Sequence, residues 1–263
     1  MEEPSIYNKM RDLLGRKYNK IIKIVSSTEV KAITVDVFDT ILLRNTKSEL
    51  QRYFEIAQLQ QALLKQEGVN ACRDSMFHAR LISTNIAYRT APLNRHERDA
   101  RIEKIFELMC ESLSIDIKYI EKFIDVELEY ERNNIELNRN LVDMLSHIGN
   151  KRKIYLLSDT YLAEKYIRHL LNFKEARLAY NGIYASCEYS LTKCGGGLFD
   201  LFCEREGVSP CAILHIGDNY HSDVQVPRRR GMAAVYLPRD LSWKVKRYSG
   251  EFIYRLRMKG MLL

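Results

Sequence analysis

Short apolar runs alternate with helical patterns along much of this chain. The runs at residues 32–35 (Ala-Ile-Thr-Val) and 154–157 (Ile-Tyr-Leu-Leu) have the length and the side chains of buried strands. Three more such runs follow toward the C-terminus, separated by stretches with helical spacing. Repeated strand–helix units favour a parallel, doubly wound sheet, so we predict an α/β fold. Strands are expected near Ile33, Tyr155, Tyr184, Leu214 and Val235.

A helical segment separates the first two strands. Residues 45–148 show helical periodicity and no strand signal. We therefore divide the chain into a core, residues 1–44 and 149–263, and an inserted all-helical unit, residues 45–148. A further amphipathic helix at Pro4–Ile24 is expected to pack on the core. Within the inserted unit, helices are predicted at Ser48–Gln66, Cys72–Tyr88, Glu97–Leu113 and Asp116–Leu137.

Composition limits the class of protein. With 263 residues and 46% hydrophobic content, the chain can bury a full core and carry one insertion. Its N-terminus is acidic, and no apolar run approaches the roughly 20 residues that a membrane span requires. We therefore expect a cytoplasmic protein. The six cysteines form no Cys-x-x-Cys pair, which favours reduced, structural thiols.

The net charge of +7 is partly concentrated near the C-terminus. Residues 243–259 interleave basic and apolar side chains in a helical pattern. This basic tail could dock on a protein partner, such as a glycosyltransferase, or on an anionic membrane surface. Such a pattern more often belongs to an ordinary solvated helix. No nucleic-acid-reading motif accompanies the charge, so no nucleic acid is expected as a partner.

Polar residues follow three of the predicted strands. Asp36 comes directly after the first strand, and Ser158-Asp159-Thr160 follows the second, before a helical pattern. Lys193 lies in a polar, glycine-rich stretch, and the strand near residue 214 leads to Asp218 and Asp223. Parallel strands end at one edge of the sheet, where ligands bind, so Asp36 is a candidate nucleophile and residues 158–160 a candidate phosphate site. A lone Asp in such a turn more often only accepts backbone hydrogen bonds, so the combination carries the hypothesis.

These four sites, in this order, resemble the motifs of the haloacid dehalogenase (HAD) superfamily, which are Asp-x-Asp-x-Thr, a strand-ending Ser or Thr, a Lys, and Gly-Asp-x-x-x-x-Asp. The resemblance spans about residues 31–237 and is specific in combination. The chain also resembles predicted hydrolases found beside, or fused to, glycosyltransferases of bacterial polysaccharide assembly. This likeness lies in the exact sequences of three segments, Asp-Val-Phe-Asp-Thr, Leu-Ser-Asp-Thr-Tyr-Leu and His-Ile-Gly-Asp-Asn. The resemblance implies a HAD-like core, with residues 45–148 as a helical cap that closes over the site and selects the substrate.

The resemblance also implies roles for single residues. The protein would be a Mg²⁺-dependent phosphatase or phosphotransferase acting through an aspartyl-phosphate on a small phosphorylated metabolite, for which a sugar phosphate of polysaccharide biosynthesis is one candidate. Asp36 would attack phosphorus, while Ser158, Asp159 and Lys193 would bind the phosphate, and Lys193 would also pair with Asp36. Mg²⁺ would be held by the oxygen ligands that it prefers: Asp36, the backbone carbonyl of Phe38, Asp218 and Asp223. Arginines in such a segment are more often solvated surface residues, but five are cap-side candidates for a second anionic group: Arg44, Arg80, Arg89, Arg95 and Arg98.

The chain departs from the phosphatase pattern at one position. In the family's phosphatases, the second residue after the nucleophile is an Asp that protonates the leaving oxygen. Here it is Phe38, and Asp39 follows one place later, where its side chain points elsewhere. Three alternatives follow: a phosphatase for substrates whose leaving group needs little protonation, a metal-independent dehalogenase-type hydrolase, or a non-catalytic binding or scaffold domain. The retained Asp218 and Asp223 favour metal-dependent phosphoryl chemistry, because three carboxylates without a cation would repel one another.

Overall fold

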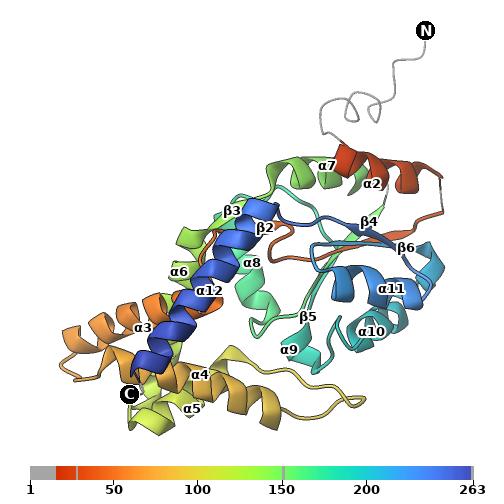
Figure 1. The fold of residues 1–263 in the computed structure, drawn as a ribbon. Coiled ribbons are helices and arrows are strands. Elements are labelled where there is room, and N and C mark those ends of the chain that lie inside the picture. The colour runs from red at the N-terminus through yellow and green to blue at the C-terminus, as the bar shows by residue number, and fades with distance from the viewer. Residues whose placement is uncertain (1–15, 28, 150–151, 262–263) are drawn as a thin grey trace.

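The computed structural model describes residues 16–27, 29–149 and 152–261, and a five-stranded parallel sheet lies at its centre (Figure 1). The sheet contains the five strands that the apolar runs predict. Two of the later strands lie on one side of β1 and two on the other, as in doubly wound folds. Of the helix predicted at Pro4–Ile24, the part before Arg16 lies outside the described residues. In sheet order the strands are β5 (Gly182–Ala185), β4 (Lys153–Ser158), β1 (Ala32–Val35), β6 (Ile213–Gly217) and β7 (Ala233–Tyr236).

Helices cover both faces of this sheet. Successive residues of a strand point to opposite faces, and β1 follows this rule: Ile33 and Val35 belong to one apolar cluster, and Ala32 to another. The first cluster includes side chains of α2 (Arg16–Ser27), α7 (Arg139–Gly149) and α8 (Glu164–Phe173). The second includes side chains of α10 (Gly197–Glu206) and α11 (Val226–Arg229). Short helical segments lie at α9 (Ser186–Tyr189), η1 (Ile117–Tyr119), η2 (Pro210–Ala212) and η3 (His221–Gln225).

The inserted segment forms a helical layer beside one end of the core (Figure 1). It contains α3 (Glu49–Gln66), α4 (Arg73–Thr90), α5 (Ile102–Leu113) and α6 (Ile120–Asn134). These are the four predicted helices, but α5 begins at Ile102 instead of Glu97, and α6 ends at Asn134 instead of Leu137. The prediction of no strand around this segment was wrong. β2 (Leu42–Arg44) pairs antiparallel with β3 (Ile135–Leu137) where the chain leaves and re-enters the core, and three-residue strands paired across such a distance have no local periodicity.

The position of α7 bears on where the cap ends. This helix contacts β4 of the central sheet, whereas α3, α4, α5 and α6 contact mainly one another. The division at residues 45–148 remains a prediction. We propose that the cap ends at the β2–β3 ribbon, near Leu137, and that α7 belongs to the core.

The C-terminal segment is one long helix. α12 (Leu241–Met261) runs along α3, so the basic tail lies against the cap layer (Figure 1). Among the described residues, no helix is long and apolar enough to cross a membrane. All six cysteines carry free thiols.

Candidate active site

Strand register brings the polar strand-end residues together. Val35 of β1 pairs with Leu156 of β4 on one side and with Ile216 of β6 on the other. The three strands therefore end at the same level, and Asp36 continues this alignment because its backbone N–H donates to the Ile216 carbonyl at 2.9 Å. Ser158 closes β4, and Asp218 follows β6.

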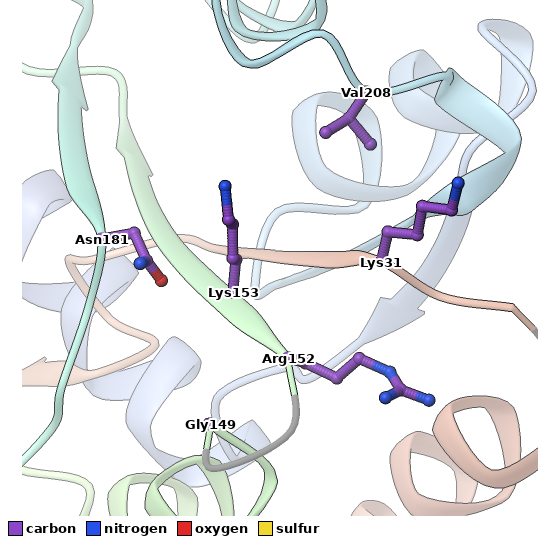
Figure 2. A pocket seen from close by; sticks show the side chains of 6 residues that line it. All are labelled: Lys31, Gly149, Arg152, Lys153, Asn181 and Val208. Atoms are coloured by element: carbon purple, nitrogen blue, oxygen red, sulfur yellow. The ribbon is translucent and has the colours of Figure 1, made fainter.

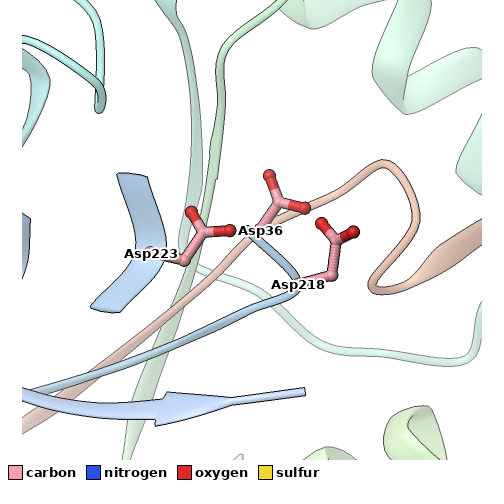
Figure 3. Close-up of side chains that lie close together, drawn as sticks. All are labelled: Asp36, Asp218 and Asp223. Atoms are coloured by element: carbon pink, nitrogen blue, oxygen red, sulfur yellow. The ribbon is translucent and has the colours of Figure 1, made fainter. Parts of the chain in front are cut away.

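Three carboxylates converge at this edge, as Figure 3 shows. One oxygen from each of Asp36, Asp218 and Asp223 lies within 4.8 Å of the others. Burial raises the pKa of Asp36 to about 8 against the attraction of Lys193, and the other two carboxylates raise it further. Burial, with the charges of Asp39 and Asp223, raises the pKa of Asp218 to about 7. The site thus holds more negative charge than its own cation balances.

That cation is Lys193. Its Nζ donates to Asp36 Oδ1 at 2.5 Å and to Asp223 Oδ1 at 2.7 Å, and the ammonium is almost fully buried. Burial alone would lower the pKa of Lys193, but Asp223 and Asp36 outweigh it, so the pKa lies above its usual value. Burial likewise opposes ionisation of Asp223, yet Lys193 and the hydrogen bond with His215 hold the pKa of Asp223 well below its usual range.

Three residues that were not among the predicted site residues support the carboxylates, and Thr34 does so through His215. Thr40 Oγ1 donates to Asp36 Oδ2 at 2.9 Å. His215 is fully buried in β6, with Nε2 at 3.2 Å from Asp223 Oδ1 and Nδ1 at 2.8 Å from Thr34 Oγ1. The sequence gives no sign that His215, inside a strand, contacts a site carboxylate.

Asp159 holds the Lys193 loop in place. Its Oδ1 accepts from the Lys193 backbone N–H at 2.6 Å, and its Oδ2 accepts from the Cys194 N–H at 3.1 Å. The predicted role of Asp159 in phosphate binding remains a prediction. In this structure, its carboxylate links the end of β4 to the loop that carries Lys193.

Glu97 holds the same loop from the cap side. Its Oε2 accepts from Thr192 N at 2.6 Å and from Thr192 Oγ1 at 2.7 Å, and its Oε1 accepts from Gly197 N at 2.8 Å. A Cβ on Gly195 or Gly197 would collide with the Glu97 carboxylate, so this close approach requires glycine. The segment from α4 to α5 therefore reaches the core directly.

Phe38 and Asp39 point to different surroundings. Arg44 places its guanidinium 4.1 Å from the centre of the Phe38 ring. Asp39 has a left-handed backbone (φ 62°), and its Oδ1 accepts from Arg44 N and from Arg239 Nη1, both at 3.1 Å. The carboxylate of Asp39 is therefore paired with Arg239.

A small polar cavity opens above the carboxylates. Its volume is about 290 Å³. His221 lies on its exposed side, and Arg44 reaches it from the cap-side ribbon, whereas Asp39 does not line it. The lining residues are Asp36, Phe38, Arg44, Ser158, Asp159, Lys193, Cys194, Asp218, Asn219, His221, Ser222 and Asp223.

The other candidate arginines do not line this cavity. Arg80 is buried, donates to both oxygens of Glu127 at 2.9 Å and lies over the ring of Phe106. Arg95 pairs with Glu204 on the core surface, and Arg98 donates to the Arg89 carbonyl. Of the five arginines, Arg44 is the one placed to meet a ligand beside Asp36.

A second, basic cavity lies at the opposite edge of the sheet (Figure 2). Its volume is about 440 Å³, and two of its lysines flank the starts of β1 and β4. Among the described residues that line it, none has a carboxylate or hydroxyl that could act as a nucleophile, so the cavity at Asp36 is the candidate active site. The residues drawn in Figure 2 are Lys31, Gly149, Arg152, Lys153, Asn181 and Val208.

Solved structures show which fold this is. No protein-family model matches the sequence, and no curated protein matches it. Yet a HAD-family enzyme of Bacteroides thetaiotaomicron in complex with magnesium is similar over 82% of this chain and 98% of its own, with 15% identity and a TM-score of 0.51. A HAD phosphatase from Thermococcus onnurineus (18% identity, 81% of this chain, 88% of its own, TM-score 0.52) has the same fold. A 2-haloacid dehalogenase from Pseudomonas syringae also has this fold (14% identity, 77% of this chain, 84% of its own, TM-score 0.51). The chain has the HAD fold, with a parallel core sheet and a helical cap.

Proposed function

We propose that this protein is a Mg²⁺-dependent phosphatase or phosphotransferase that forms an aspartyl-phosphate on Asp36. The observation that carries the proposal is the convergence of Asp36, Asp218 and Asp223 around the Lys193 ammonium at the carboxyl edge of a HAD-fold sheet. The Bacteroides enzyme of the same fold has been solved with magnesium and inorganic phosphate together, which supports this chemistry.

The residues present fit a divalent cation. Three carboxylates share one ammonium, and the raised pKa values of Asp36 and Asp218 express the repulsion and burial that a cation would relieve. Asp36, Asp218 and Asp223, with the backbone carbonyl of Phe38, are the proposed ligands. Bound Mg²⁺ would supply charge neutralisation and polarise a phosphoryl oxygen.

The chain's own residues then have definite tasks. A carboxylate oxygen of Asp36 attacks phosphorus, the bond from phosphorus to the leaving oxygen breaks, and that oxygen keeps the electron pair. Lys193 and Ser158 stabilise the charge on the phosphoryl oxygens. In a phosphatase, water then attacks phosphorus, the bond from phosphorus to the Asp36 oxygen breaks, and the carboxylate is restored as inorganic phosphate leaves. In a phosphotransferase, an acceptor hydroxyl attacks instead and carries the phosphoryl group away as an ester.

The cavity narrows the substrate class. A volume of about 290 Å³ lies at the low end of the range for ligand pockets, roughly 300–1,000 Å³. Arg44 can pair with a second anionic or hydroxyl group beside the phosphate. We therefore propose a small phosphorylated metabolite, and we include sugar phosphates on the strength of the sequence likeness to hydrolases of polysaccharide assembly.

The test is phosphate release from a panel of phosphomonoesters and acyl phosphates, with Mg²⁺ and with EDTA. We expect turnover that requires Mg²⁺ and that Asp36→Asn abolishes, because the amide removes the nucleophile but keeps its size. The matched variant Asp143→Asn, on the exposed side of α7, should retain full activity. Halide release from 2-haloacids in EDTA would identify the dehalogenase alternative. No turnover of any compound would favour the scaffold alternative.

A further inference from the structure

α12 has one face packed on the cap. Trp243 Nε1 donates to the carbonyls of Arg44 and Asn45 at 3.0 and 2.9 Å. One and two turns later, Arg247 donates to the Lys47 carbonyl at 3.3 Å, and Glu251 accepts from the Leu50 N–H at 3.3 Å. These contacts fix which side of α12 faces the protein.

The opposite face of α12 is apolar and exposed. Its large side chains recur every three or four residues, which places them on one stripe of the helix. These side chains are 53% to 77% exposed, and a contiguous exposed apolar patch of this kind commonly marks an interaction site. We call this the α12 stripe, and it consists of Leu241, Val245, Tyr248, Phe252 and Leu256.

Cations border the α12 stripe. Lys244 and Arg255 flank it on one side, and Lys246 on the other, as the helical angle of 100° per residue requires. Glu251 is the one acidic residue in the sequence of α12, and it is turned toward the Leu50 N–H and Arg255. The free face therefore combines apolar and positive groups.

We propose that α12 docks this protein on an anionic membrane surface, with the α12 stripe in the interface between headgroups and acyl chains. Amphipathic helices that bind in this way combine a stripe of aromatic and aliphatic residues with flanking Lys and Arg. The charge pattern decides against a second copy of the chain as the occupant, because a two-fold pair of stripes would bring Lys244 and Arg255 of each copy against cations of the other. Anionic lipid headgroups complement this pattern.

The assay is co-sedimentation of the full chain with vesicles of phosphatidylcholine alone or mixed with phosphatidylserine. We expect binding to the mixed vesicles, weak binding to the neutral ones, and a loss of about ten-fold or more in affinity for the double variant Phe252→Ser with Leu256→Ser. Lys246→Ser should weaken binding to the mixed vesicles and reduce its dependence on salt. Ile117→Ser, which removes an exposed apolar side chain from the cap, is the matched control and should bind as the unmodified protein does.

Trp243 reports whether the variants keep the structure. It is the chain's only tryptophan and lies on the packed face, so unchanged fluorescence shows that α12 is still docked. Two results would overturn the proposal: equal binding to neutral and anionic vesicles, or no binding to either. A concentration-dependent dimer that the Phe252 and Leu256 double variant abolishes would also overturn it, in favour of pairing between two copies.

Discussion

Glu97→Gln should lower the proposed phosphatase activity although Glu97 does not line the cavity at Asp36. The carboxylate accepts three hydrogen bonds from the stretch that surrounds Lys193, two from Thr192 and one from Gly197. An amide has one accepting oxygen, so an N–H of the loop would face an NH₂ group instead of an acceptor. Hydrogen bonds to a charged group contribute about 1.5–3 kcal/mol each, and we take the lost bond as about 2 kcal/mol.

That figure limits the effect on turnover. A loss of about 2 kcal/mol changes the population of the native loop position by up to about 30-fold, at 1.4 kcal/mol per factor of ten. Asp159 still accepts hydrogen bonds from the Lys193 and Cys194 N–H groups, so part of the preference for the native loop position remains. We expect kcat/KM to fall about ten-fold. The fold should survive, because domains typically have 5–15 kcal/mol of stability.

The control is Glu204→Gln. It breaks the ion pair of Glu204 with Arg95 in the same cap-to-core contact, but both partners are about half exposed, and such pairs contribute about 0–1 kcal/mol. Gly195→Ala should act in the same direction as Glu97→Gln, since its Cβ would push the carboxylate away. Steady-state kinetics well below the unfolding temperature, with circular dichroism as the check on folding, measures all three. Unchanged kcat/KM in Glu97→Gln would show that the Lys193 loop does not depend on this carboxylate.

Two further predictions concern the site itself. Asp218→Asn should weaken Mg²⁺ binding by about ten-fold or more, because it removes a charged oxygen ligand. Isothermal calorimetry measures this affinity, and an unchanged value would show that Asp218 is not a ligand of the proposed metal site. Phe38→Asp should flatten the dependence of single-turnover rate on leaving-group pKa, because general acid catalysis typically contributes about 10² to 10⁴ in rate. The unmodified protein should prefer aryl and acyl phosphates, and a flat profile in it would mean that another group, with His221 the first to test, already donates the proton.

The strands and their polar ends could be predicted because the signals are local. An apolar run of four to six residues forms a buried strand where helices cover both faces of the sheet, and the next polar residue then lies at the sheet edge. Asp36 and Ser158 are such residues. The ribbon of β2 and β3 could not be found in this way, since it depends on pairing Leu42 with Leu137.

Glu97 was missed for the same kind of reason. Residues 97–101 contain good helix formers, so propensity extends the predicted α5 through them. In the structure these residues cross to the core, and Ile102 N donates to the Tyr161 carbonyl at 3.0 Å where α5 begins. A tertiary contact overrides the local preference here. The hydrogen-bond partners of Glu97 lie 95 and 100 residues away, where no periodic pattern reaches.

Asp39, the acid that stands one place late in the first motif, shows how contacts between distant residues affect the chemistry that the site can perform. The sequence indicates that the side chain of Asp39 points elsewhere than the acid of the phosphatase pattern, but it does not show which residue Asp39 contacts. Arg239, 200 residues later, supplies that partner, and its guanidinium lies 4.4 Å from the Trp243 ring at the start of α12. Asp39 thus joins the loop that follows Asp36 to the start of α12 through Arg239, and it does not line the cavity. In the proposed phosphatase, the leaving group would therefore take its proton from water, from the substrate or from the exposed His221. For this reason, leaving-group acidity is the property of the substrate that the site should discriminate most strongly.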